Sequence, residues 1–274
     1  MAEEASRQLL EDVKRYLKAS DFSDFDITCH DHIFRVHKLV LCTRSQFFAN
    51  ALKFPGKHHV PKSDPADQEH EEGRIDLPDD EPAMIKLMID YIYSAEYEPF
   101  LPRDISKIAA GDVRPKHSCK SGHMACPNYG SSRIVCLHHT CGVSCAFTCT
   151  DFVCDTCHPP PVIIPGSSGQ LLTHAKMYEM GDKYQVSGLK ELSQFKFELA
   201  CAKFWHDKVF AQAAAHAFST TPEDDKGLRR IVIKTISEHM GLLKKKEVSA
   251  LLMEFNGLAF GLLVEKAEKN GWLD

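Results

Sequence analysis

The chain has 274 residues, of which 43% are hydrophobic and 26% charged, and its formal net charge is −5. These values are typical of a globular protein with a sizeable core, in one large domain or two smaller ones. The acidic balance argues against a non-specific nucleic-acid binder, and no run of about 18 apolar residues predicts a membrane span. The N-terminal segment is acidic and amphipathic, unlike a secretory signal, so we expect a cytoplasmic or nuclear protein with reduced thiols.

The first part of the sequence has the patterns of a helix, a β-hairpin, a second helix, a short strand and a third helix. Leu9, Val13 and Leu17 give the first helix an apolar side. Asp79 and Asp80 precede a proline and are candidate caps for the third helix. These elements are predicted at residues 3–18, 26–30 with 32–36, 38–52, 74–77 and 84–92, and residues 55–73 are expected to form a loop.

Helical patterns resume late in the chain, with one helix from Leu171 and a second from Gly188. Three or four further helices are predicted between residues 204 and 274, with breaks near Pro222 and Gly257. The segment from residue 99 to 169 has no such pattern and is rich in cysteine, histidine, glycine and proline. We therefore interpret this segment as an insertion between two parts of one domain.

Four motifs occur together in the flanking sequence: Asp26 in the first strand, FRVHK at residues 34–38, RSQFF at 44–48 and DKY at 182–184. In this combination the chain closely resembles the BTB/POZ domain, in the variety with an inserted segment that is common in filamentous fungi. The resemblance covers residues 20–98 and 170–200. It implies a mixed α+β fold in which a small sheet packs against helices.

The resemblance predicts three regions. Residues 1–100 and 170–200 form a discontinuous BTB/POZ domain, and residues 101–169 form a Cys/His-rich insertion. Residues 201–274 form an all-helical C-terminal extension. The two parts of the domain are expected to share one hydrophobic core.

The resemblance also implies a non-enzymatic protein–protein interaction module, which forms a homodimer or acts as an adaptor or scaffold. Leu9 and Val13 are candidate dimer contacts, although packing of their helix within its own chain explains them equally well. Asp26 and Lys38 match a charged pair in the exposed groove of dimeric family members. The alternative for this pair is a surface salt bridge of little energetic weight.

Two alternative functions stay open. The chain could be a substrate adaptor of a cullin-based ubiquitin ligase, in which helices after the core help to hold the cullin. No cullin contact motif is identified between residues 204 and 274. The other alternative is a nuclear zinc-containing regulator whose insertion contacts nucleic acid, but the insertion is only mildly basic and a nucleic-acid partner is not favoured.

Eight of the eleven cysteines lie between Cys119 and Cys157. Zinc takes four sulfur or nitrogen donors, often offered as close pairs such as the CDTC sequence at residues 154–157. The segment has little apolar content, so it needs metal or cross-links to fold. The alternatives are reduced thiols without metal, or disulfides. The candidate zinc ligands are Cys119, Cys126, Cys136, His138, Cys141, Cys145, Cys149, Cys154, Cys157 and His158.

No catalytic motif is present: the sequence has no GxSxG elbow, no phosphate-binding loop and no HExxH helix. Helix capping accounts for Asp79 and Asp80, and a solvated loop accounts for the acidic residues between 69 and 72. We therefore predict that the chain is not an enzyme.

Overall fold

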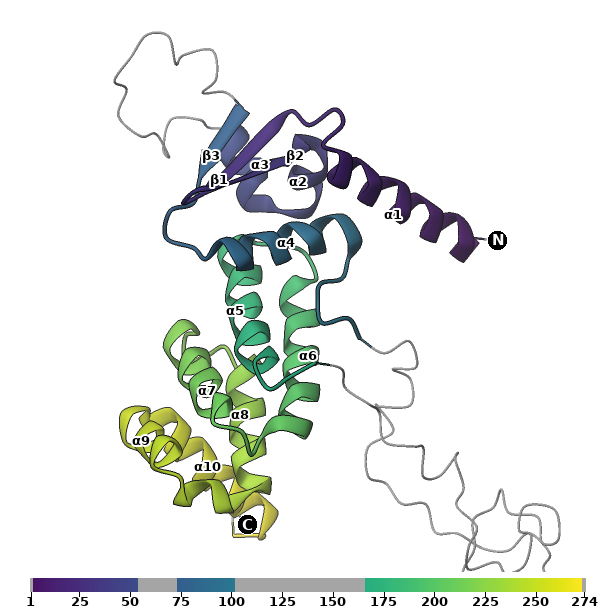
Figure 1. The fold of residues 1–274 in the computed structure, drawn as a ribbon. Coiled ribbons are helices and arrows are strands. Elements are labelled where there is room, and N and C mark those ends of the chain that lie inside the picture. Colours follow the sequence, from purple (N-terminus) through teal and green to yellow (C-terminus); the bar gives the residue numbers. More distant parts are fainter. Residues whose placement is uncertain (1, 54–72, 102–165, 273–274) are drawn as a thin grey trace, which may run out of the picture. The chain divides into compact units, whose positions relative to one another are not determined.

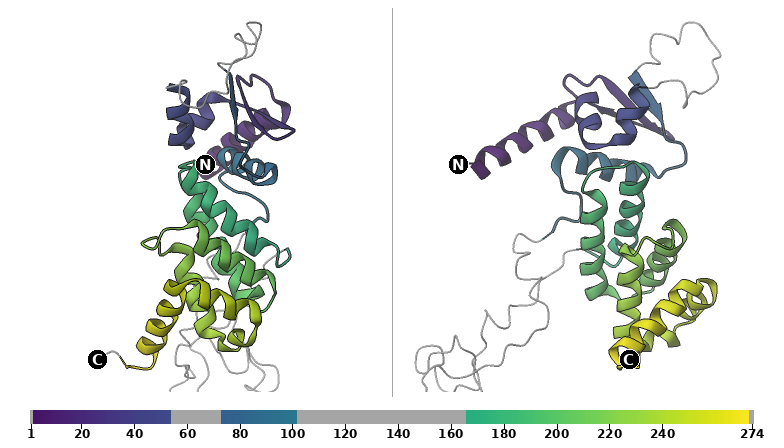
Figure 2. Two further views of the ribbon diagram at one scale, coloured as in Figure 1. Left: turned by 90° about the vertical axis from the view of Figure 1, so that its left-hand side faces the viewer. Right: turned by 180° about the vertical axis from the view of Figure 1, so that it is seen from behind.

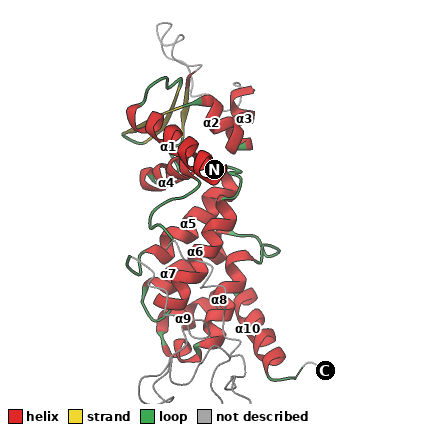
Figure 3. Cartoon of the chain, turned by 90° about the vertical axis from the view of Figure 1, so that its right-hand side faces the viewer, coloured by secondary structure: helices red, strands yellow, loops and turns green. Residues whose placement is uncertain are grey.

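The computed structural model describes residues 2–53, 73–101 and 166–272, and these residues are mainly helical (Figures 1 and 3). Residues 1–100 and 166–274 belong to one compact unit, so the segments before and after the insertion are assembled together. In the described residues, the first segment contains a three-stranded sheet and four helices, and all the regular elements of the second segment are helices. The predicted mixed α+β class is therefore confirmed.

The sheet has the strand order β2-β1-β3. Strands β1 (Phe25–Cys29) and β2 (His32–Val36) pair antiparallel across a two-residue turn, in which His30 has a φ of 51°. This is the predicted hairpin. Strand β3 (Arg74–Asp76) pairs parallel with β1. Alternation along β1 turns its apolar side chains into the core.

Helix α1 (Ala2–Ala19) contacts α4 (Pro82–Ser94), and both lie where the sequence predicts them. The helix predicted at residues 38–52 is instead two helices, α2 (Lys38–Arg44) and α3 (Gln46–Lys53), because Ser45 adopts an extended conformation. The buried hydroxyl of Ser45 donates a hydrogen bond of 2.6 Å to the carbonyl oxygen of Tyr184. A contact across 139 residues thus breaks the helix.

Helices α5 (Gln170–Lys183) and α6 (Leu189–Phe204) run side by side below α4 in Figure 1, and Figure 2 shows the pair from two further sides. The remaining elements follow in order. They are α7 (Val209–Thr220), α8 (Gly227–Glu238), a short 3₁₀ helix (Met240–Lys244), α9 (Lys246–Glu254) and α10 (Asn256–Lys269). Within the described ranges no single helix has the length and apolar composition of a membrane span; only α9 and α10 together reach them, across a 103° bend.

The two sides of the insertion share a hydrophobic core, as the sequence predicts. The rings of Phe48 in α3 and Tyr184 after α5 are stacked with centroids 5.7 Å apart. The hydroxyl of Tyr91 in α4 donates a hydrogen bond of 3.0 Å to the carbonyl oxygen of Ser187. This core holds the inward faces of the sheet, α2, α3 and α4 against Met177, Met180, Tyr184, Val186 and Leu189.

A second core lies on the other side of α5 and α6, where both helices pack against α7, α8, α9 and α10. Helix α6 contributes Leu189 to the first core and Phe197 to the second. The predicted limit at residue 200 therefore falls inside one continuous helix that serves both cores.

The start of α4 differs from the expected aspartate cap. Its N-cap residue is Glu81, and no side chain caps it. The carboxylate of Asp80 instead accepts two hydrogen bonds of 2.9 Å from the Lys183 ammonium and one from the Tyr184 hydroxyl. Asp80 therefore joins α4 to the end of α5, and the DKY motif supplies both partners.

Candidate functional site

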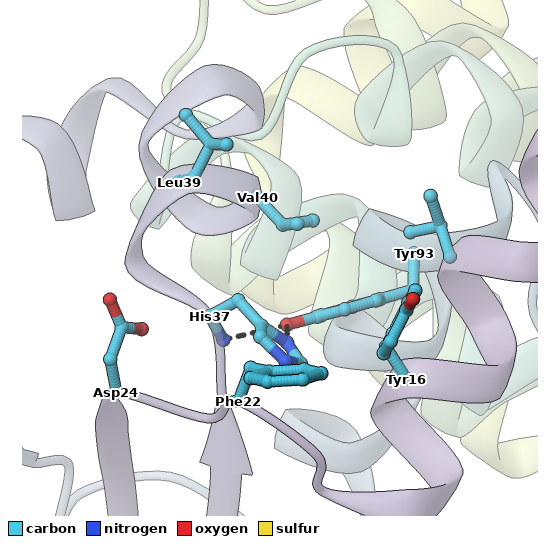
Figure 4. Close-up of a pocket in the computed structure, with 8 residues that line it drawn as sticks. Tyr16, Phe22, Asp24, His37, Leu39, Val40 and Tyr93 are labelled. Carbon is cyan, nitrogen blue, oxygen red and sulfur yellow. Dashed lines mark hydrogen bonds between the residues drawn. The ribbon is translucent and has the colours of Figure 1, made fainter.

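A pocket of about 310 Å³ opens where α1, α2 and α4 meet the end of the sheet (Figure 4). Four parts of the chain supply its walls: α1, the segment that follows it, the start of α2, and α4. The lining is mainly apolar. It consists of Val13, Tyr16, Phe22, Asp24, His37, Leu39, Val40 and Tyr93.

His37 and Tyr93 form the polar centre of the pocket (Figure 4). The His37 ring lies 2.7 Å from the Tyr93 hydroxyl through Nδ1 and 2.7 Å from the Asp21 carbonyl oxygen through Nε2. Because a carbonyl can only accept, Nε2 carries the hydrogen in the neutral ring, and Nδ1 accepts from the Tyr93 hydroxyl. That hydroxyl also accepts the His37 backbone N–H at 2.7 Å.

These three hydrogen bonds join α4, the start of α2 and the segment after α1. Burial raises the pKa of Tyr93 to about 12, although the His37 N–H opposes the shift, so the hydroxyl keeps its hydrogen at neutral pH. His37 therefore holds the pocket walls together. Its nitrogens are both engaged within the chain.

Asp24 is the acidic residue of the pocket. Its carboxylate accepts the Lys38 backbone N–H at 2.8 Å, at the first turn of α2. The first N–H groups of a helix have no partner within the helix, and the positive end of the helix dipole favours an anion there. Asp24 therefore stabilises the start of α2 from a position 14 residues earlier in the chain.

Asp26 and Lys38 lie near the pocket but not in its lining. Asp26 is half-buried in β1, between Arg35 of β2 and Arg74 of β3 in the strand register. The Lys38 ammonium lies 5.9 Å from the centre of the Phe25 ring. Among the ion pairs of residues 2–53, 73–101 and 166–272, none joins Asp26 to Lys38. A binding role for these two residues stays a prediction.

The rim of the pocket is apolar and exposed. Phe22 is 85% exposed and Leu39 76%, although each is a large apolar side chain. On α1, Val13 and Leu17 pack against the first core, whereas Leu9 is 66% exposed. The sequence identified Leu9 and Val13 but missed Phe22 and Leu39. The exposure of Leu39 could have been predicted from the helical period. Leu41 faces the core, and a residue two positions earlier points to a different side of the helix.

The predicted zinc ligands, from Cys119 to His158, lie outside the described residues. Within the described residues no group of three or more histidine, cysteine, aspartate or glutamate side chains could hold a metal ion. Cys29 and Cys201 are buried free thiols, and Cys42 is a half-buried free thiol. Burial raises the pKa of all three thiols, so none is activated as a nucleophile.

A model of the BTB/POZ domain family matches residues 13–110. The chain contains a BTB/POZ domain. The match begins in α1 and includes the sheet, α2, α3, α4 and every residue of the pocket lining. In the structure, helices α5 and α6 and a helical C-terminal extension are joined to this BTB/POZ domain. No curated protein matches the sequence.

BTB/POZ domains are in general protein–protein interaction modules, and the pocket agrees with that role. Its walls are apolar, its rim presents exposed apolar side chains, and the hydrogen-bonding groups of His37 and Tyr93 are used within the chain. Such a surface can bury another apolar surface. The insertion and its zinc ligands stay a prediction.

Proposed function

We propose that the BTB/POZ domain of this chain associates with itself through α1 and the rim of the pocket. The observation that carries this proposal is the exposure of Leu9, Phe22 and Leu39 around an apolar pocket. Large exposed apolar side chains grouped on one face mark interaction sites in soluble proteins. The occupant that fits best is a second copy of the same face.

The geometry of α1 supports this choice. Leu9, Val13 and Tyr16 recur at intervals of four and three residues and therefore share one side of the helix. Val13 and Tyr16 line the pocket, and Leu9 continues the same apolar side beyond it. In a twofold-symmetric contact the same patch is used twice, so protruding side chains and an apolar pocket on one face can complement each other.

The oligomeric state of the full chain tests the proposal. Sedimentation equilibrium should give twice the chain mass for the wild type, and Leu39→Glu should shift the equilibrium to the monomer. Leu263→Glu is the matched control, because Leu263 is also a largely exposed leucine and lies on α10. A wild-type protein that stays monomeric at high concentration, or a Leu39→Glu variant that dimerises as well as the control, would exclude self-association through this face.

A second candidate function is that of an adaptor, whose C-terminal helices bind a different protein such as a cullin. Met253 on α9 and Phe260 and Leu263 on α10 are 81%, 69% and 60% exposed. A helix that carries apolar residues on several sides is usually covered by another surface. These residues lie outside the matched BTB/POZ segment, so the two functions are separable.

Binding of a purified cullin N-terminal domain tests the adaptor function. If the C-terminal helices bind it, Phe260→Glu should weaken binding at least tenfold, and Leu39→Glu should leave it unchanged. Equal binding by wild type and Phe260→Glu, or none by either, would remove this candidate.

Zinc in the insertion is a further part of the proposal, supported by the spacing of its cysteines and histidines. Elemental analysis of the purified protein should find one or two zinc ions per chain. Replacing Cys154 and Cys157 by serine should lower the zinc content, whereas Cys42→Ser, in the described part, should not change it. Folded protein without zinc would contradict the proposal.

A further inference from the structure

Lys196 carries a buried ammonium whose hydrogen-bonding capacity is fully used. The residue lies in α6 and its side chain is 1% exposed. Its ammonium donates to the carbonyl oxygen of Pro99 at 2.9 Å, to the carbonyl oxygen of Tyr97 and to the Glu96 carboxylate. An ammonium has three N–H donors, so these acceptors satisfy it completely.

All three acceptors lie in the segment that leaves α4 toward the insertion. A buried charge is tolerated only when it is paired and hydrogen-bonded, and loss of its partners is strongly unfavourable. The ammonium also lies 3.9 Å from the centre of the Tyr97 ring. Residues 96–99 are therefore fixed against α6 by a group that cannot leave them without a large cost.

Tyr97 adds contacts to both helices of the α5–α6 pair. Its hydroxyl lies 3.0 Å from Nδ1 of His174 in α5 and 3.2 Å from the hydroxyl of Ser193 in α6. All three side chains are buried. The outgoing end of the insertion is thus bonded to α5 as well as to α6.

The returning end of the insertion is held beside the outgoing end. Gln170, the buried first residue of α5, donates a hydrogen bond of 2.9 Å to the carbonyl oxygen of Ser167. Gly166 has a φ of 89°, a conformation that favours glycine. A Cβ built on Gly166 would lie 3.7 Å from the Cβ of Pro99, which is ordinary van der Waals contact. The chain therefore leaves the domain near Pro99 and re-enters it at Gly166, and these two residues lie side by side.

We propose that Lys196, Tyr97 and Gln170 form a clamp that holds the two ends of the insertion side by side. The chain then leaves the domain after Phe100 and re-enters it at Gly166 through one closed base beside α5 and α6. The clamp explains why a charged residue is buried where the core could have used an apolar one. It does not depend on self-association of the domain.

Hydrogen exchange of the 274-residue chain, followed by mass spectrometry, tests the clamp. In Lys196→Met, peptides that cover residues 96–101 and peptides that cover residues 166–171 should both exchange at least tenfold faster. Peptides from β1 and α10 should exchange as in the wild type. Lys234→Met is the matched control, because Lys234 forms a 3.2 Å ion pair with Glu198 but is 48% exposed. This control should leave both ends of the insertion unchanged.

Faster exchange at both ends of the insertion is the decisive result. If Lys196 acted only on the segment that it contacts, its replacement would accelerate exchange at one end alone. Faster exchange at residues 96–101 alone, no change at either end, or equal acceleration over the whole domain would each overturn the proposal. If Lys196→Met does not fold, Gln170→Ala tests the clamp from the returning end. It should likewise accelerate exchange at both ends, and a change confined to residues 166–171 would overturn the proposal.

Discussion

His174 is a buried histidine whose charge state depends strongly on its surroundings. Burial, with a smaller contribution from the nearby Lys196 ammonium, lowers the pKa of His174 from 6.5 to about 3. In the unfolded chain the ring takes up a proton near pH 6.5, whereas in the folded chain it stays neutral. Between these values the unfolded state binds more protons, so stability falls as the pH falls through this range.

We expect the free energy of unfolding to decrease by about 1.4 kcal/mol per pH unit from this residue alone, below about pH 6.5. Urea unfolding at several pH values between 7 and 4 measures the slope. His174→Gln should flatten it, and His30→Gln, at an exposed histidine in the β1–β2 turn, should not. Identical slopes in wild type and His174→Gln would show that another group causes the pH dependence.

Residue-scale roles were predictable only in part. The sequence motifs single out Asp26 and Lys38, but they do not show which acidic side chain reaches the start of α2. The structure gives that position to Asp24, through its bond to the Lys38 N–H. The role of Tyr93 was not predictable from the sequence, because its hydrogen-bond partner His37 lies 56 residues away in the chain.

At the scale of elements, the backbones of α5 and the start of α6 are packed closely together. A Cβ on Gly181 would lie 2.9 Å from the backbone nitrogen of Lys190 and 3.2 Å from its Cα. Those are backbone atoms, so the helices themselves would have to move apart. We expect Gly181→Ala to lower the free energy of unfolding by about 1–3 kcal/mol, as overpacking does in cores.

Thermal and urea unfolding check this prediction against Gly257→Ala. Gly257 lies in α10, and its added Cβ would meet only the end of the Arg229 side chain at 3.7 Å. That control should be neutral or stabilising, because alanine favours a helix over glycine by roughly 0.5–1 kcal/mol. If the two variants are equally stable, α5 and α6 are not in such close contact.

Most elements were predictable because their apolar periods are local. The helix break at Ser45 was not, because Leu41 and Phe48 keep one helical period through it. The cause lies elsewhere in the chain: Ser45 pairs with Val186 as an isolated β-bridge and bonds to Tyr184. The aspartate cap predicted for α4 failed for a similar reason, since Lys183 and Tyr184 bind Asp80.

At the scale of the whole molecule, the domain depends on contacts between segments on opposite sides of the insertion. Phe48 is fully buried and stacks on Tyr184. We expect Phe48→Ala to lower the free energy of unfolding by about 3–5 kcal/mol. Phe260→Ala, at an exposed site on α10, is the matched control and should cost little. A loss below about 1 kcal/mol in Phe48→Ala would contradict a core shared across the insertion.

The proposed function, self-association, depends on the apolar face around the pocket. Hydrogen exchange at two protein concentrations tests directly whether this face forms the contact between two chains. The 274-residue chain should be measured far below and far above the midpoint of its self-association. We predict that amides of α1 and of residues 37–43 exchange more slowly at high concentration, while those of α10 do not change. Exchange in α1 and α2 that is independent of concentration, while the mass doubles, would contradict the account.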